Sequence, residues 1–470
     1  MSLKKIYFSL FLIGCFFLPF NDFEGFPVLG EFKNETGAFF FFAGFIVLII
    51  ECLMTGKIPI PYRSQLFKVL CLFLIWCFVT TLLNVDSVSQ NFFKHTTGFS
   101  RFFRQYFSLT LSTVFFFIFY WNIVSKMSSS QILFTIRKIL LLGLVFTFVY
   151  GFLETLIVIF HIGLLRPMLA LFDYFPFLDV NYPSVDRISS VAYESPALGN
   201  YLITVSGWMF SYILTEKNKY RFLPTVMVLF LTFFSGSRTA LINVGLQLFI
   251  LIYVMYSMKE YKAILLNTLT YTVIIAFIAL ILNGQSIIKE IDKKADSLNF
   301  SKNLKDDVSN QSRFGMQYAS LQVFKENPII GVGFGQETYH KRRHYPGWAK
   351  NNNYEFKLLY ENQNVKSFPT AYNLYTRLLA ETGLVGISLW LFLIYLTISK
   401  SKLIWKEGKN EEKTLGLILL ISFSGLSLNW MQTDFFRQYG FWLCFAILIK
   451  ITNSLNHTSI YPKNNNSSKI

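Results

Sequence analysis

Residues 37–55 read GAFFFFAGFIVLIIECLMT, an apolar run of 19 residues that contains one charged side chain, Glu51. A helix that crosses a bilayer needs about 20 predominantly apolar residues, so this run predicts a membrane span. Runs of the same kind recur along the chain and predict an all-α polytopic membrane protein with about twelve transmembrane helices. The predicted spans lie near residues 6–20, 37–55, 66–84, 106–124, 139–161, 198–215, 222–236, 239–257, 263–282, 383–399, 414–430 and 438–453.

The composition of the chain supports this class. Of its 470 residues 53% are hydrophobic and 15% are charged, whereas charged residues make up about 25% of a soluble domain. The net charge of +16 could indicate nucleic acid, but most basic residues lie at the ends of predicted spans, where they contact anionic lipid headgroups. We therefore expect membrane lipid as a partner and no nucleic acid.

A long polar segment, from Asn283 to Pro369, separates nine predicted spans from the last three. A membrane protein with one large polar loop is expected to carry its chemistry on the side of that loop. The sequence thus divides into an N-terminal membrane bundle (1–283), a large loop domain (284–370), a C-terminal membrane bundle (371–453) and a polar tail (454–470).

Basic residues in short loops remain on the cytoplasmic side of a membrane, and their positions predict that both termini are cytoplasmic and that the large loop is exported. Several arginines then lie on the exported side, against this rule, and need another reason for their presence. They are Arg101, Arg104, Arg187, Arg238, Arg313, Arg342, Arg343 and Arg437. Glu154 lies within the fifth predicted span, where an ionisable side chain needs a partner.

Neither a metal site nor a nucleotide site is indicated. His340 and His344 have a ligand-like spacing, but three basic residues lie between them and would repel a cation. The glycines Gly331, Gly333 and Gly335 do not match a phosphate-binding loop, so we expect them to allow a turn and close backbone packing. No cofactor is predicted.

Three motifs together resemble the O-antigen ligase and polymerase family. The first is Phe234-Ser-Gly-Ser-Arg-Thr-Ala-Leu. The second is Ser312-Arg-Phe-Gly-Met-Gln-Tyr-Ala with Asn327-Pro-Ile-Ile-Gly-Val-Gly, and the third is Tyr372-Asn373, which nine residues separate from Gly383-Leu-Val-Gly386. No single motif is specific, whereas their order and spacing over residues from about 185 to 440 are.

The resemblance implies a metal-independent glycosyltransferase of GT-C-like fold in the bacterial inner membrane, with one large periplasmic loop domain. Its substrates would be undecaprenyl-diphosphate-linked oligosaccharides, as donor and as acceptor, and a chain-length-regulating membrane protein would be a partner. In such a reaction negative charge grows on the leaving diphosphate. Arginine suits this task because its planar fork binds phosphate oxygens and keeps its charge.

Four residues are therefore predicted to be catalytic: Arg238, Arg313, Glu194 and Arg187. Arg238 follows a Ser-Gly-Ser break between two spans, and its alternative role is to anchor the span at the headgroups. Arg313 is expected to open an amphipathic helix over 313–324 and could equally be a solvated helix start. Glu194 could deprotonate the acceptor hydroxyl, or it could form a helix-entry salt bridge with Arg187.

Substrate binding is predicted for Tyr372, Asn373, Asp434, Arg437, Arg342 and Arg343. Asp434 and Arg437 could instead pair with each other. Arg377 and Glu381 share a helical face with Asn373, and we expect them to form a surface salt bridge. The aromatic residues around Arg342 and Arg343 suit sugar rings, although the composition of an ordinary loop would account for them as well.

Tyr372 decides between two activities. Ligases of the family carry His at this position, and that His is thought to serve the acceptor reaction. Tyrosine, with an ordinary pKa of about 10, is a poor general base at neutral pH. This favours a polymerase over a ligase that transfers glycan to lipid A core. A lipid-linked glycan flippase is a third alternative, but it would need polar residues in the spans and an internal repeat.

Overall fold

The computed structural model describes residues 2–181, 187–258, 261–263, 265–266, 308–351 and 353–460. In these ranges the regular secondary structure is helical apart from one hairpin, in which β1 (Phe92–Phe93) pairs with β2 (Thr96–Thr97) in antiparallel fashion. The helices before the undescribed segment are α1 (Leu3–Phe16), α2 (Thr36–Thr55), α3 (Gln65–Leu83), α4 (Val85–Gln90), α5 (Gly98–Thr110), α6 (Phe116–Val124), α7 (Ser129–Gln131), α8 (Arg137–Val158), α9 (Arg166–Ala170), α10 (Ser195–Thr215), α11 (Leu223–Phe234) and α12 (Arg238–Ser257). Those after it are α15 (Val308–Glu326), α16 (Glu337–Lys341), α17 (Gly347–Lys350), α18 (Leu374–Glu407), α19 (Glu411–Asn429) and α20 (Tyr439–Ile460).

Short helical segments of tighter or wider pitch lie between these helices. Two of them, η2 (Leu111–Phe115) and η3 (Ile132–Ile136), join α5 to α6 and α7 to α8 without a break. The others are η1 (Pro27–Phe32), η4 (Gly163–Leu165), η5 (Leu171–Tyr174), η6 (Lys219–Phe222), η7 (Arg342–His344) and η8 (Phe356–Tyr360).

Six helical stretches of the described residues are long and apolar enough to cross a membrane. They are Thr36–Thr55, Gln65–Leu83, Gly98–Val124, Ser129–Val158, Arg238–Ser257 and Leu374–Glu407. The chain is thus an all-α, multi-pass membrane protein. Four further predicted spans correspond to α1, α10, α11 and α19, which are shorter or less apolar than these six. Tyr439–Ser454 is a shorter apolar helix, and the predicted span 263–282 falls almost entirely outside the described residues.

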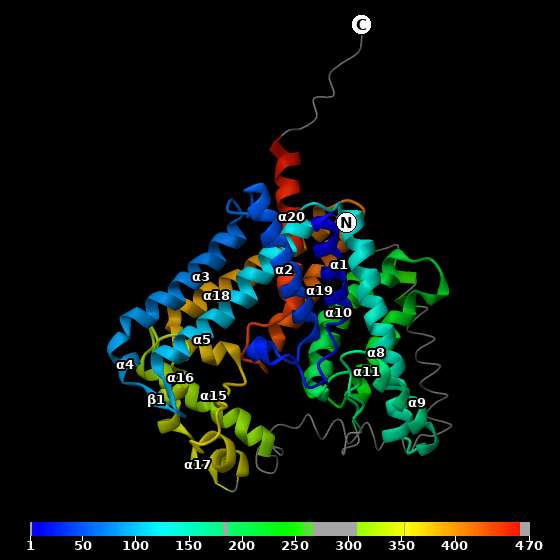
Figure 1. Ribbon diagram of the computed structural model, residues 1–470. Helices are drawn as coiled ribbons and strands as arrows, with labels where there is room; N and C mark the ends of the chain where they lie inside the picture. Colours follow the sequence, from blue (N-terminus) through cyan, green and yellow to red (C-terminus); the bar gives the residue numbers. More distant parts are fainter. Residues whose placement is uncertain are drawn as a thin grey trace.

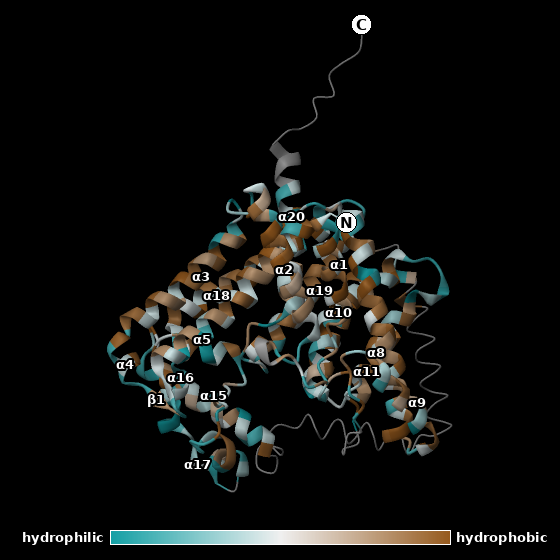
Figure 2. Ribbon diagram, in the orientation of Figure 1, coloured by the Kyte–Doolittle hydropathy of each residue, from teal (hydrophilic) through white to brown (hydrophobic). Residues whose placement is uncertain are grey.

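The helices separate into an apolar bundle and a more polar lobe. Figure 1 shows the start of α1 and the helix α20 at one end of the molecule and α15, α16 and α17 at the other. Apolar residues cover the long helices, whereas polar residues are frequent in the lobe around α15, α16 and α17 (Figure 2). The start of α1 and the helix α20 therefore lie at the end away from the lobe.

Small residues let the bundle helices approach closely. A side chain at Gly207 of α10 would lie 2.6 Å from the Ser422 hydroxyl of α19, and one at Gly425 would lie 2.4 Å from the carboxamide of Gln247. That carboxamide donates to the carbonyls of Ile203 and Ile421 at 3.0 and 3.2 Å. Close approach and interhelical hydrogen bonds are the usual means of helix association in a membrane, and here they join α10, α12 and α19.

The glycine-rich loop 327–335 packs against a break in α18. Gly331 has a φ of +70°, and a Cβ there would lie 2.5 Å from the carbonyl carbon of Glu381. Val332 and Gly333 donate their N–H groups to the carbonyls of Ala380 and Glu381, both at 3.0 Å. This confirms the predicted role of the glycines in close backbone packing, and it fixes the lobe to α18.

Glu154 has the partner that its place in a span requires. Its carboxylate is fully buried in α8 and accepts the backbone N–H groups of Ser189 and Ser190 at 3.1 and 2.7 Å. The N–H of Ile188 is also bound, by the carbonyl of Phe234. These contacts hold the segment that leads to Glu194 against α8 and α11.

A candidate active site along one face of α15

One face of α15, the helix that carries Ser312–Ala319 of the second sequence motif, contacts the first and third motifs. The Arg238 guanidinium donates to the Asn310 side-chain oxygen at 3.2 Å, the Arg313 guanidinium lies 5.6 Å from the centre of the Tyr372 ring, and the Asn373 carboxamide is 3.5 Å from that of Gln317. Asn310, Arg313 and Gln317 are spaced by three and four residues and therefore share a helical face. Residues from α12, α15 and the start of α18, separated by more than 130 positions, meet along this line.

Helix α15 differs from the helix predicted around Arg313. It begins at Val308 rather than at Arg313, so Arg313 lies within its second turn instead of at its start. Met316 and Ala319, within the predicted amphipathic segment, are fully buried in the lobe. The interpretation of Arg313 as a solvated helix start is therefore wrong, and its side chain is directed along the face that meets Tyr372.

Arg238 begins α12 and Glu194 directly precedes α10, and the two helices pack tightly together. Ser237 caps α12 by accepting the N–H of Ala240, which leaves Arg238 as the first helical residue. One turn into α10, a Cβ at Gly199 would lie 2.9 Å from the Ala240 side chain and 3.0 Å from the Ser237 hydroxyl. The starts of α10 and α12 are thereby held side by side, which places the Glu194 carboxylate and the Arg238 guanidinium at the same end of the bundle.

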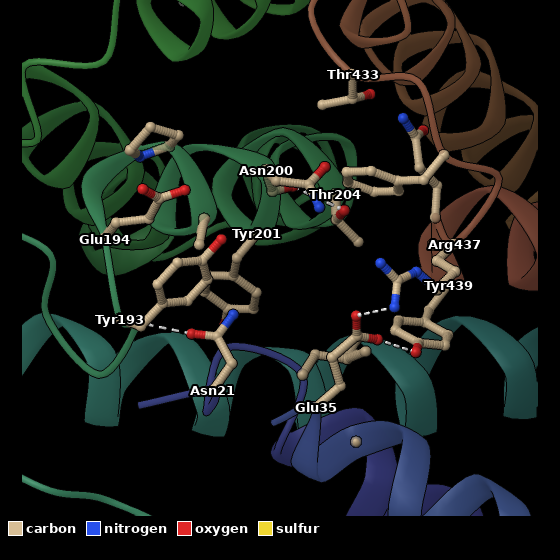
Figure 3. Close-up of a pocket in the computed structure, with 17 residues that line it drawn as sticks. Asn21, Glu35, Tyr193, Glu194, Asn200, Tyr201, Thr204, Thr433, Arg437 and Tyr439 are labelled. Carbon is tan, nitrogen blue, oxygen red and sulfur yellow. Dashed lines mark hydrogen bonds and ion pairs between the residues drawn. The ribbon is translucent and has the colours of Figure 1, made fainter. Parts of the chain in front are cut away.

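Glu194 lines a cavity of about 200 Å³, which we call the Glu194 cavity. Figure 3 shows its labelled lining residues, with Tyr193, Glu194 and Asn200 on one side and Arg437 and Tyr439 on the other. The Glu35 carboxylate bridges that second side, because it pairs with Arg437 at 3.4 Å and accepts a hydrogen bond from the Tyr439 hydroxyl. Glu194 is exposed to the cavity, so its carboxylate can reach a substrate hydroxyl there.

Arg437 also lines a second cavity, of about 320 Å³, which we call the α5 cavity. Its lining contains five basic and four acidic side chains. The basic residues are Arg101, Arg104, Lys366, Arg377 and Arg437, and the acidic residues are Glu31, Glu337, Glu381 and Asp434. Burial disfavours the charge on Arg437, but the neighbouring acidic groups, Glu35 first among them, together outweigh that effect and raise the pKa of the guanidinium. Arg437 therefore keeps its positive charge between the two cavities.

Arg377 and Glu381 form a buried pair rather than the predicted surface salt bridge. Their side chains are 8% and 3% exposed, and Nε of Arg377 lies 3.2 Å from the Glu381 carboxylate. The same guanidinium donates to the carbonyl of Asp434 at 2.8 Å and to Gln105 at 2.9 Å. The helical spacing correctly predicted the pair, but it could not reveal that α5 and the loop before α20 cover it.

Asp434 and Arg437 do not pair with each other as the sequence had allowed. The Asp434 carboxylate accepts the backbone N–H of Ala371 at 2.6 Å, and Arg437 is bound by Glu35 and by the carbonyl of Glu31. Both residues still line the α5 cavity. Glu35 and Gln105, which complete these interactions, carried no sequence signal because their partners are several hundred residues away.

The remaining predicted residues line neither of these two cavities. Arg342 and Arg343 line a third pocket, described below, that shares no lining residue with the two cavities. Arg187 is exposed and lines none of the three. It lies at the edge of a described range, and the structure does not join it to Glu194.

The side chains of Tyr372 and Asn373 are held by their surroundings. The Tyr372 hydroxyl is 2.7 Å from that of Tyr360, which donates to Glu355 at 3.1 Å. The Asn373 side-chain oxygen caps α18 by accepting the N–H groups of Tyr375 and Thr376. Asn373 thus has a structural function, and only its amide nitrogen is directed to α15.

Comparison with known proteins agrees with the motifs. No curated protein matches the chain. A family model described as O-antigen ligase matches residues 223–391, a range that contains Arg238, Arg313 and Tyr372 together with the whole of α15. Over these residues the chain is similar to the O-antigen ligase family.

Proposed function

We propose that the chain is a glycosyltransferase of the bacterial inner membrane that polymerises undecaprenyl-diphosphate-linked repeat units at the periplasmic face. The observation that carries the proposal is the face of α15, along which Arg238, Arg313 and Tyr372 come together within the matched residues. An O-antigen or a related surface polysaccharide would be the product.

The proposed reaction needs two kinds of group. The acceptor hydroxyl attacks the anomeric carbon of the donor sugar; a new glycosidic bond forms, the bond from that carbon to the lipid diphosphate breaks, and the acceptor loses a proton. Arg238 and Arg313 would stabilise the charge that grows on the leaving diphosphate, because arginine forks bind phosphate oxygens and stay charged. This role needs no metal ion.

Glu194 is the proposed proton acceptor. It is a carboxylate exposed to the Glu194 cavity at the start of α10, beside the helix that begins with Arg238. A base must lie within hydrogen-bond reach of the hydroxyl that it deprotonates, and the cavity offers space for that hydroxyl next to Glu194.

Tyr372 supports polymerase rather than ligase activity. Its hydroxyl is engaged with Tyr360, and a phenol is a weak base at neutral pH. Ligation of glycan to lipid A core remains the second candidate, since the family model that matches the chain is described as a ligase.

The first experiment is an electrophoretic profile of lipopolysaccharide from a strain without this gene. Core that carries a single repeat unit would support the polymerase, because ligation would continue. Bare core with long glycan left on the lipid carrier would support the ligase instead. An unchanged ladder would refute both roles in lipopolysaccharide assembly.

Complementation with variants then tests the site. We expect Arg238→Ala and Arg313→Ala to lose polymer while the protein remains inserted and abundant. Arg63→Ala removes an exposed arginine near the start of α3 that lines none of the cavities, and it should restore the ladder. Full activity of both site variants would refute the diphosphate role.

A further inference from the structure

A third pocket lies in the lobe, between residues 90–92 and residues of the loop domain. Its volume is about 400 Å³, which is within the range of small-ligand sites. We call it the Arg342 pocket. Its lining comes from segments that are distant in sequence: the end of α4 with β1, α16 and η7 with Tyr345, and Glu361 directly after η8. Its lining residues are Gln90, Asn91, Phe92, Tyr339, Arg342, Arg343, Tyr345 and Glu361.

The two arginines give the pocket positive charge. The Arg342 guanidinium stacks on the Phe93 ring at 3.7 Å, which fixes its plane, and both Arg342 and Arg343 are exposed. In the described part of the chain neither forms an ion pair. The one carboxylate of the pocket, Glu361, is already paired with Lys350 at 2.6 Å. The pocket can therefore accept an anion without displacing an internal partner.

Polar and aromatic groups complete the lining. The buried hydroxyl of Tyr345 has no hydrogen-bond partner in the described ranges, although buried polar groups nearly always have one. Asn91 uses its amide nitrogen to bind Gln336 at 3.0 Å, so its oxygen stays available. The Phe92 ring is 62% exposed. Amide, hydroxyl and aromatic groups beside arginines are suited to a sugar ring that carries a carboxylate.

We propose that the Arg342 pocket binds a carboxylate-bearing sugar residue of the glycan, as a second contact besides the site on α15. The proposal rests on the proposed function, because it assigns a second contact to the same substrate. Arg342 would bind the carboxylate with its fixed fork, Tyr345 would supply its unused hydroxyl, and Phe92 would pack against the ring. Such a contact would retain a growing chain between successive additions.

Binding of short oligosaccharides to the full-length protein in detergent tests this proposal without any lipid-linked substrate. The probes are tetragalacturonate, which is acidic, and maltotetraose, which is neutral. We expect tetragalacturonate to bind more tightly, and we expect Arg342→Gln to weaken it by about tenfold or more, because a charged bidentate contact is lost. Tyr345→Phe should weaken it by a smaller factor.

Lys357→Gln is the matched control, since Lys357 is exposed on η8 and does not line the pocket. It removes the same charge and should leave the affinity for tetragalacturonate unchanged. Equal affinities of Arg342→Gln and Lys357→Gln would overturn the proposal, and so would a wild-type protein that prefers maltotetraose. If Arg342→Gln is unstable, Arg343→Gln replaces it in the same comparison.

Failure of this inference can be told apart from failure of the proposed function. A gene deletion that shortens the polysaccharide, combined with an Arg342→Gln variant that binds tetragalacturonate normally, would refute the pocket and keep the polymerase. An unchanged ladder in the deletion strain, combined with selective binding that needs Arg342, would refute the polymerase and keep an acidic-sugar site.

Discussion

The buried pair of Arg377 and Glu381 allows a quantitative prediction. Replacing Arg377 with Met removes the partner of a carboxylate that is 3% exposed and whose second oxygen, Oε2, already has no hydrogen-bond partner among the described residues. It also removes the hydrogen bonds to the Asp434 carbonyl and to Gln105. Breaking a buried ion pair from one side typically costs about 3–5 kcal/mol, because it leaves an uncompensated charge.

We expect Arg377→Met to reduce the free energy of unfolding by that amount. Arg377→Met/Glu381→Met should be more stable than Arg377→Met alone, by at least about 1 kcal/mol, because the lone carboxylate is then gone. Arg104→Met is the control, since Arg104 lines the same cavity but is exposed.

The assay is reversible unfolding in mixed micelles, titrated with sodium dodecyl sulfate and followed by circular dichroism. The cycle needs the wild type, both single variants and the double variant. Changes that add within about 0.5 kcal/mol would refute the reasoning, because independent sites behave in that way. A loss in Arg377→Met no larger than in Arg104→Met would refute it as well.

Three further predictions follow from single positions. Gly383→Ala should destabilise the protein by about 3 kcal/mol or more, because Gly383 has φ +62° and ψ −165° and a Cβ there would clash with the Ile329 carbonyl oxygen. The control Gly245→Ala, which has open space at its Cβ, should change stability by at most about 1 kcal/mol. Equal melting temperatures of the two variants would contradict this prediction. Burial, then Arg343, lowers the pKa of His340 from its usual 6.5, so the unfolded chain binds the proton more readily. Stability should fall as the pH drops below about 6.5 toward the lower folded pKa, and His340→Gln should lose this dependence in unfolding measured from pH 5 to 8. Lys94→Met should reduce the free energy of unfolding by about 2 kcal/mol, because the buried ammonium donates to the carbonyls of Leu359 and Ser367 at 2.5 and 2.6 Å. A reduction no greater than that in Lys357→Met would count against this prediction.

Local sequence properties predicted much of the architecture. Six of the predicted spans coincide with helices long and apolar enough to cross a membrane, and four more coincide with shorter or less apolar helices. The turn role of the glycines at 331, 333 and 335 was also predictable, since each has a positive φ that only glycine adopts readily. The order of the three motifs indicated the family that the match over 223–391 supports.

The site was only partly predictable, because helical spacing says which residues share a face and not what covers that face. The pair of Arg377 and Glu381 follows from their spacing, but its burial depends on Gln105, 272 positions away. The start of α15 at Val308 was missed because the segment before Arg313 is polar and shows no apolar period. The substrate roles of Arg238, Arg313, Glu194 and Tyr372 remain predictions.

By itself the sequence determined that this chain is a multi-pass helical membrane protein with basic loops, a polar lobe and a family-like set of motifs. These are local properties, since the apolar content of about 20 consecutive residues decides whether a segment can enter a bilayer. Only the tertiary structure decided that Arg238, Arg313 and Tyr372 meet along α15, that Arg437 stands between two cavities and that residues 90–92 complete the Arg342 pocket. Each of these depends on contacts between segments far apart in the chain, which are set by the packing of whole helices rather than by any local pattern.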